Sequence, residues 1–165
     1  MLTALHLGNF KAFAETQRIP HRPLTLIYGA NSAGKSSIIH SLLLAQHAME
    51  KGDFDVHRMD IAGESVDLGG FRQYIYGRNA GRRLEWSIDL NVVDITTPLA
   101  ETEVLPSHKI GGLQVYQRRN RLAELLEPTN VVSIAQSYGV PLDDTGMPLA
   151  GSTPHIVSYE ILGDG

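Results

Sequence analysis

The 165-residue sequence contains no cysteine, one tryptophan and no long apolar run. Without cysteine, disulfide bonds and thiolate metal sites are excluded. No apolar stretch is long enough to cross a bilayer, and the residues after Met1 do not form a charged-then-apolar signal segment. The net charge of −4 argues against a generally basic nucleic-acid surface. We therefore expect a cytoplasmic protein without membrane contact, and 42% hydrophobic residues are enough for a globular core.

One segment carries a nucleotide-binding pattern. Residues 29–36 fit G-x-x-x-x-G-K-[ST], with Gly29, Gly34, Lys35 and Ser36 at the fixed positions. The glycines let backbone N–H groups converge on an anion, and the following helix adds its positive end. Lys35 would reach the β- and γ-phosphates, the Ser36 hydroxyl would complete a Mg²⁺ shell, and Ser37 would face the α-phosphate side. The pattern predicts ATP and Mg²⁺ as ligands.

The flanking residues supply the expected context. "PLTLIYG" (residues 23–29) is typical of a buried strand, and "SSIIHSLLLAQHAMEK" (residues 36–51) predicts a helix that ends at Gly52. Two apolar stripes on this helix predict packing on more than one side, as for a helix against a parallel sheet. The stripes are Ile38, Leu42, Ala45 and Met49, and Ile39 with Leu43.

The remainder of the chain is mostly strand-like. A first strand is expected around Leu5 to Leu7, residues 53–70 resemble a loop, and "FRQYIYG" (residues 71–77) is expected to pair with the alternating strand 84–92. Further strands are expected at residues 109–118, 130–139 and 155–162, with one helix at 120–128. The sequence predicts an α/β protein, with a phosphate-loop core at residues 1–52 and a mainly antiparallel β lobe at residues 53–165 of the same incomplete domain.

"GNFKAF", "PLTLIYGANSAGKSS" and the apolar helix together resemble the N-terminal part of the ATPase heads of the RecF, SMC and OLD-nuclease group. These are AAA-family ATPases within the ABC ATPase superfamily, with a P-loop NTPase fold. The resemblance implies that Asn9 to Phe13 lie near the base and ribose, and that Gln73 couples Mg²⁺ to lobe motion. It implies a second head as homodimer partner, and a DNA-related role of the full-length protein in repair or phage defence. By position, the phosphates would be wrapped by Asn31, Ser32, Ala33, Gly34, Lys35, Ser36 and Ser37.

Several residues have a structural interpretation beside the functional one. Gln73 could be a solvated strand residue, since half of a strand's side chains face water, and Gln46 a plain helix-surface residue. His57 with Asp53, Asp55 and Asp60 could be a metal cluster or a solvated acidic loop. A cluster of arginines could line a DNA phosphate track or simply be solvated at a hairpin tip. This cluster comprises Arg72, Arg78, Arg82 and Arg83.

The sequence has no clear catalytic residue. Hydrolysis in this fold needs an acidic strand ending in Asp-Glu, but around Asp94 the apolar run is interrupted and Ile95 occupies the glutamate position. A serine-glycine signature is absent, and His108 and His155 lie in the wrong context for a switch histidine. The chain ends on an Asp-Gly turn, so we expect the N-terminal portion of a longer ATPase, inactive by itself. The alternatives are a noncatalytic interaction module that retains a phosphate loop, and a small phosphotransferase.

Overall fold

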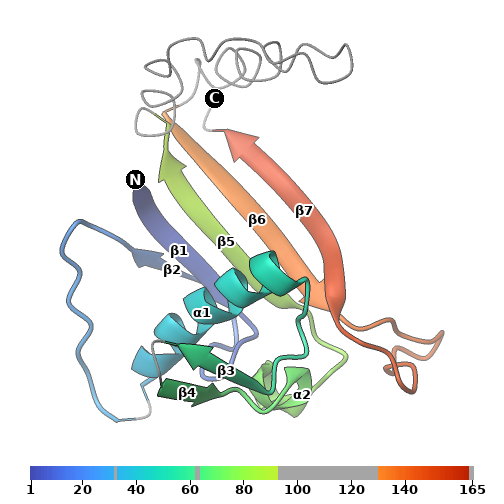
Figure 1. The fold of residues 1–165 in the computed structure, drawn as a ribbon. Coiled ribbons are helices and arrows are strands. Elements are labelled where there is room, and N and C mark those ends of the chain that lie inside the picture. Colours follow the sequence, from blue (N-terminus) through green and yellow to red (C-terminus); the bar gives the residue numbers. More distant parts are fainter. Residues whose placement is uncertain (32, 62–63, 93–129, 164–165) are drawn as a thin grey trace, which may run out of the picture.

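The computed structural model describes residues 1–31, 33–61, 64–92 and 130–163 (Figure 1). A five-stranded antiparallel sheet has the order β2-β1-β5-β6-β7, and a separate hairpin is formed by β3 and β4. The described elements are β1 (Leu2–Gly8), β2 (Gln17–Pro20), α1 (Lys35–Lys51), β3 (Arg58–Ile61), β4 (Glu64–Asp67), α2 (Phe71–Tyr74), the 3₁₀ turn η1 (Tyr76–Arg78), β5 (Leu84–Asn91), β6 (Val131–Gly139) and β7 (His155–Gly163). No described helix is long and apolar enough to cross a membrane.

Helix α1 packs on one face of the sheet, and the core lies between them (Figure 1). Its buried residues meet Leu84 and Trp86 of β5 and Tyr138 of β6. The helix begins after Gly34, at φ 86°, and ends at Gly52, at φ 70°, whose N–H bonds the Ala48 carbonyl. Both glycines occupy the left-handed region that other residues avoid. The predicted helix and its glycine terminus are confirmed.

The expectation that α1 is packed on more than one side is wrong. Its buried residues form one stripe that includes Ile38, Ser41, Leu44 and Ala48. Ile39 is 55% exposed and Met49 is 81% exposed. Leu42 and Leu43 are partly buried against the core, but the fully buried residues of the helix lie on the one face that meets the sheet.

The buried strand predicted at residues 23–29 is not formed. These residues pair with no described strand, and their side chains are not buried: Leu24 and Leu26 are each 78% exposed and Tyr28 is 92% exposed. The described strands pair with one another instead, and β1 already has β2 and β5 as its two neighbours. An apolar run predicts a buried strand, but the strand is buried only when neighbouring strands are present to pair with it.

The antiparallel half of the prediction is largely confirmed. β5, β6 and β7 match the expected strands at residues 84–92, 130–139 and 155–162 within one residue at each end. The predicted alternation is seen at the start of β5, where Leu84 and Trp86 are buried and Glu85 is exposed, whereas residues 87–91 are all partly buried. The expected strand 109–118 and helix 120–128 lie outside the described residues.

Residues 53–78 differ from the prediction in two ways. "FRQYIYG" forms α2 and the turn η1 instead of a strand, and Phe71, Tyr74 and Ile75 are buried at helical spacing. The segment read as a loop contains the β3–β4 hairpin, in which Met59 pairs with Val66. The aromatic rings of Phe10 and Phe71 each lie 5.5 Å from the ring of Tyr74, so this segment is part of the core.

Asp89 of β5 connects three strands across the sheet. Its carboxylate lies 3.0 Å from Nε2 of His6 on β1 and accepts a 2.6 Å hydrogen bond from Oγ of Ser133 on β6. Burial by itself would raise the pKa of Asp89, but the hydrogen bonds from His6 and Ser133, and the charges of His6 and Arg18, hold it below the usual value. The ionised carboxylate therefore stabilises the sheet.

Replacing Asp89 with asparagine is expected to lower the free energy of unfolding by about 1–2 kcal/mol at neutral pH. Because the folded-state pKa is depressed, this contribution is present above the unfolded-state pKa, and it is lost as the pH falls through the folded-state value. Urea unfolding of wild type and variant should therefore converge below about pH 4. Asp144→Asn, at an exposed position, is the matched control. A difference that stays constant down to low pH would contradict this account.

Candidate nucleotide-binding site

The phosphate loop joins the exposed segment 23–28 to the first turn of α1. Gly29 has φ 151° and Gly34 has φ 86°. The Lys35 side chain folds back across the loop, and its Nζ donates hydrogen bonds to the carbonyl oxygens of Gly29, at 2.7 Å, and Ala30, at 2.6 Å. The two ends of the motif are thereby held together by the one residue that carries its positive charge.

The first turn of α1 presents the donors and the hydroxyl that the pattern requires. α1 has no side-chain cap at Gly34, so the amide groups of its first turn are available to an anion at the positive end of the helix. Asn31, Ala33 and Ser36 are exposed, whereas Ser37 is buried, which leaves the Ser36 hydroxyl as the accessible one. Ser32 lies outside the described residues.

The turn after β1 lies against the end of the phosphate loop. Phe10 and Phe13 exchange backbone hydrogen bonds of 3.0 and 2.8 Å. A Cβ at Gly34 would meet Cβ of Ala12 at 3.2 Å and Cε2 of Phe13 at 3.3 Å. Residues 9–13, which the sequence placed near base and ribose, are thus next to the motif in space.

This turn also contributes a cation that the sequence reading did not single out. Lys11 has φ 46°, and its Nζ donates a 2.7 Å hydrogen bond to Nδ1 of His40 on α1. Burial lowers the pKa of Lys11, and the charge of Asp67 partly opposes this shift. The pKa of His40 is also lowered, first by burial and then by the charge of Lys11. The signal was present in "GNFKAF", where a lysine adjoins the residues already assigned to the nucleotide.

Gln73 lies on α2 and not on a strand, with an exposed side chain. It lines a hollow of about 290 Å³ together with Arg72, Asp55 and His57, and the lining includes no phosphate-loop residue. Its role toward Mg²⁺ stays a prediction. Gln46 is exposed and donates a hydrogen bond to Glu50, as expected for a residue on the helix surface.

The other candidate clusters have structural partners. Asp55 accepts a 2.7 Å hydrogen bond from the amide of Phe71, and His57 lies 3.9 Å from the same carboxylate. Within the described residues no group of three His, Asp or Glu side chains could hold a metal ion. In the arginine cluster all four residues are exposed, and Arg82 donates a 2.8 Å hydrogen bond to Oδ1 of Asn9.

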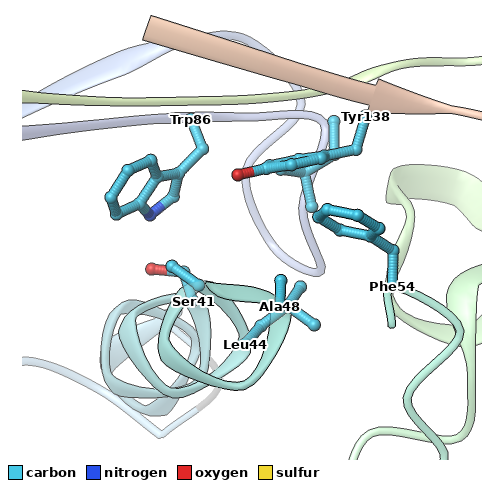
Figure 2. Close-up of a pocket in the computed structure, with 8 residues that line it drawn as sticks. Ser41, Leu44, Ala48, Phe54, Trp86 and Tyr138 are labelled. Carbon is cyan, nitrogen blue, oxygen red and sulfur yellow. The ribbon is translucent and has the colours of Figure 1, made fainter. Parts of the chain in front are cut away.

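The cavity between α1 and the sheet is not a ligand site. It has a volume of about 10 Å³, and Figure 2 shows that Trp86 and Tyr138 enter it from the sheet, opposite Ser41 and Leu44 of α1. Such a space is at most the size of one water molecule. Trp86 Nε1 is buried there without a hydrogen-bond partner among the described residues. The cavity is therefore part of the packing between α1 and the sheet, and Trp86 lies within that packing.

The sequence around this loop matches a known protein family. A family model described as an AAA domain matches residues 4–103, which is more than half of the chain. The chain belongs to this AAA-domain family. The family comprises AAA-family ATPases found in SMC- and RecF-like proteins, and the match includes most of β1 together with the phosphate loop, α1 and β5. No curated protein shows significant similarity to this AAA-domain chain. As an AAA-family ATPase domain it carries the expectation of nucleotide and Mg²⁺ binding.

Proposed function

We propose that this chain is the ATP-binding part of a RecF/SMC-like ATPase head, which holds MgATP on residues 29–37 and hydrolyses it only with further strands and a second head. The observation that carries the proposal is Lys35, whose Nζ lies over the loop on the carbonyls of Gly29 and Ala30. Phosphate oxygens are stronger partners for an ammonium group than neutral carbonyls, so a triphosphate would replace them.

The exposed segment 23–28 supports the requirement for further strands. Its apolar side chains are uncovered, and it runs directly into the phosphate loop at Gly29. Strands that paired with this segment would end near the bound phosphates, because neighbouring parallel strands end at the same edge of a sheet. An acidic strand in that position would supply the Mg²⁺ ligand and the water-orienting carboxylate that this sequence lacks.

The proposal also includes two partners. A second head would close over the γ-phosphate, and DNA would be the substrate on which the full-length protein acts in repair or phage defence. Arg72, Arg78 and Arg83 are exposed within one short segment of a chain of net charge −4, and they are the residues proposed to contact DNA. If these residues contact DNA phosphates, binding should weaken steeply as salt is raised.

Calorimetric titration with MgATP tests nucleotide binding directly. The chain should bind MgATP and MgADP, and AMP much more weakly, because the loop contacts the β- and γ-phosphates. If none of the three nucleotides gives a binding heat in the titration, a noncatalytic interaction module would be favoured. Formation of a phosphorylated small molecule from ATP, detected by mass spectrometry, would favour a phosphotransferase.

Ser36→Ala is expected to reduce ATP affinity about tenfold when Mg²⁺ is present and to have little effect in EDTA. The hydroxyl is exposed at the first turn of α1, where it can replace one water in the metal shell. Ser36→Thr keeps the hydroxyl and is the matched control. Equal losses with and without Mg²⁺ would show that Ser36 does not bind the metal.

A further inference from the structure

The turn after β1, formed by residues 9–13, packs directly against the start of α1. A Cβ at Gly34 would meet side-chain atoms of Ala12 at 3.2 Å and of Phe13 at 3.3 Å, so both side chains lie against this glycine. Gly34 immediately precedes the first-turn amide groups that would bind phosphate. A shift of the turn would therefore move the amide groups on which the proposed nucleotide binding depends.

The backbone of this turn is strained. Asn9 has φ 54° and Lys11 has φ 46°, in the left-handed region that residues with a Cβ seldom occupy. Such a conformation persists only where the surrounding structure holds it. Part of the support comes from the following segment, because the Lys11 amide donates to the Tyr74 carbonyl at 2.6 Å. The Tyr76 amide donates to the Asn9 carbonyl at 2.9 Å.

Arg82 supports the same turn with its side chain. Its own backbone is held just before β5, where its amide donates a 3.0 Å hydrogen bond to the Asn79 carbonyl. Its Nη1 donates a 2.8 Å hydrogen bond to Oδ1 of Asn9. Cζ of the guanidinium group lies 5.4 Å from the centroid of the Tyr76 ring, a cation–π contact that restricts the direction of the side chain. Because guanidinium nitrogens are only donors, the amide oxygen of Asn9 must face Arg82, and this contact fixes the Asn9 side chain.

We propose that Arg82 is a positioning residue for nucleotide binding. Through Asn9 it holds the turn against Gly34, and so it keeps the first turn of α1 in place for phosphate binding. The inference rests on the proposed MgATP site, and it assigns Arg82 no contact with the nucleotide itself.

Arg82→Ala is expected to weaken MgATP binding about fivefold, because one hydrogen bond from a charged group is lost from the support of the turn. Inorganic triphosphate with Mg²⁺ should lose affinity by the same factor, since the turn acts on the phosphate site. Arg82→Lys keeps a donor and a charge and should restore most of the affinity. Titration calorimetry measures each affinity. A loss for ATP without a loss for triphosphate would place the turn at the base or ribose and overturn the proposal.

Arg58→Ala is the matched control. Arg58 is also an exposed arginine, and its side chain donates a hydrogen bond to Oγ of Ser65 within the β3–β4 hairpin. Its removal changes the net charge equally and also deletes one hydrogen bond, but it leaves the turn untouched. This variant should bind MgATP like wild type. An equal loss of affinity in both variants would show a general effect of charge and refute the role of Arg82.

A double-mutant cycle with Asn9 separates positioning from a general loss of stability. Asn9→Gly removes the acceptor of the Arg82 hydrogen bond, and glycine readily adopts φ 54°. If Arg82 acts through Asn9, Arg82→Ala should cause almost no further loss of affinity in the Asn9→Gly chain. Additive losses of affinity, or a lower unfolding midpoint with unchanged affinity, would contradict the proposal.

Hydrogen exchange of the nucleotide-free chain tests the same role without a ligand. The amides of Lys11 and Phe13 report on the turn, and the amide of Ile38 donates to the Gly34 carbonyl at 3.3 Å. All three should exchange about fivefold faster in Arg82→Ala and not in Arg58→Ala. If these rates change but wild type binds no MgATP, the proposed function fails and Arg82 still holds the loop. If the rates do not change in the folded variant, the positioning role fails, whatever the chain binds.

Discussion

Lys35→Ala is expected to weaken MgATP binding by about 100-fold, since two charge-assisted hydrogen bonds to phosphate are each worth more than 1 kcal/mol. In the described structure the Lys35 ammonium contacts only the carbonyls of Gly29 and Ala30, and its side chain is not part of the core. The fold should therefore survive the substitution. Isothermal titration calorimetry with Mg²⁺ measures the affinity, and Trp86 fluorescence checks that α1 remains packed on the sheet.

Lys51→Ala is the matched control for this substitution. Lys51 is an exposed lysine at the last residue of the same helix, so its removal changes the net charge equally but leaves the phosphate loop intact. It should bind MgATP like wild type. Equal affinity of wild type and Lys35→Ala would remove the loop from the list of nucleotide sites, whatever the oligomeric state of the protein.

The 165-residue chain is expected to release phosphate from ATP at least about 10³-fold more slowly than a complete ATPase head. The loop positions phosphates, but phosphoryl transfer also needs an oriented water and charge from the opposite side. A steady-state phosphate assay should give the same rate for wild type and Lys35→Ala. In a longer form that contains an acidic strand and a signature segment, turnover should appear and increase with protein concentration.

The opposite result is equally clear. Turnover by the purified chain that is lost in Lys35→Ala and independent of protein concentration would show a complete active site within this sequence. The small phosphotransferase would then become the leading hypothesis. A nuclease or DNA-binding assay cannot make this distinction, since both hypotheses allow contact with DNA.

The elements that sequence reasoning predicted well are those whose determinants are local. α1 has its glycine ends at Gly34 and Gly52, and β5 begins with buried Leu84 and Trp86 on either side of exposed Glu85. The motif itself located the loop. What local patterns cannot contain is the partner of an apolar segment, which is why residues 23–29 were predicted as a buried strand and lie exposed.

The prediction of a strand at residues 71–77 was wrong for a different reason. "FRQYIYG" contains β-favouring aromatic and branched residues, but Phe71, Tyr74 and Ile75 follow the spacing of a helix face. Gly70, at φ 81°, turns the chain so that this face enters the core. The helical spacing of these residues is present in the sequence, but the β-favouring residue types led to the prediction of a strand. Contacts such as that between Lys11 and His40 depend on the tertiary fold and have no local signal.

The pairing of β1 with β5 places Leu5 beside Ile88, and the whole phosphate loop lies in the chain between them. Closing so long a segment costs more conformational entropy than joining neighbouring strands, so we expect β1 to join the sheet late in folding. Because α1 packs on Trp86 and Tyr138, it also needs β5 and β6 before it can dock. A nascent chain would therefore acquire its nucleotide loop geometry only after β6, which comes much later in the sequence than the loop, has been synthesised.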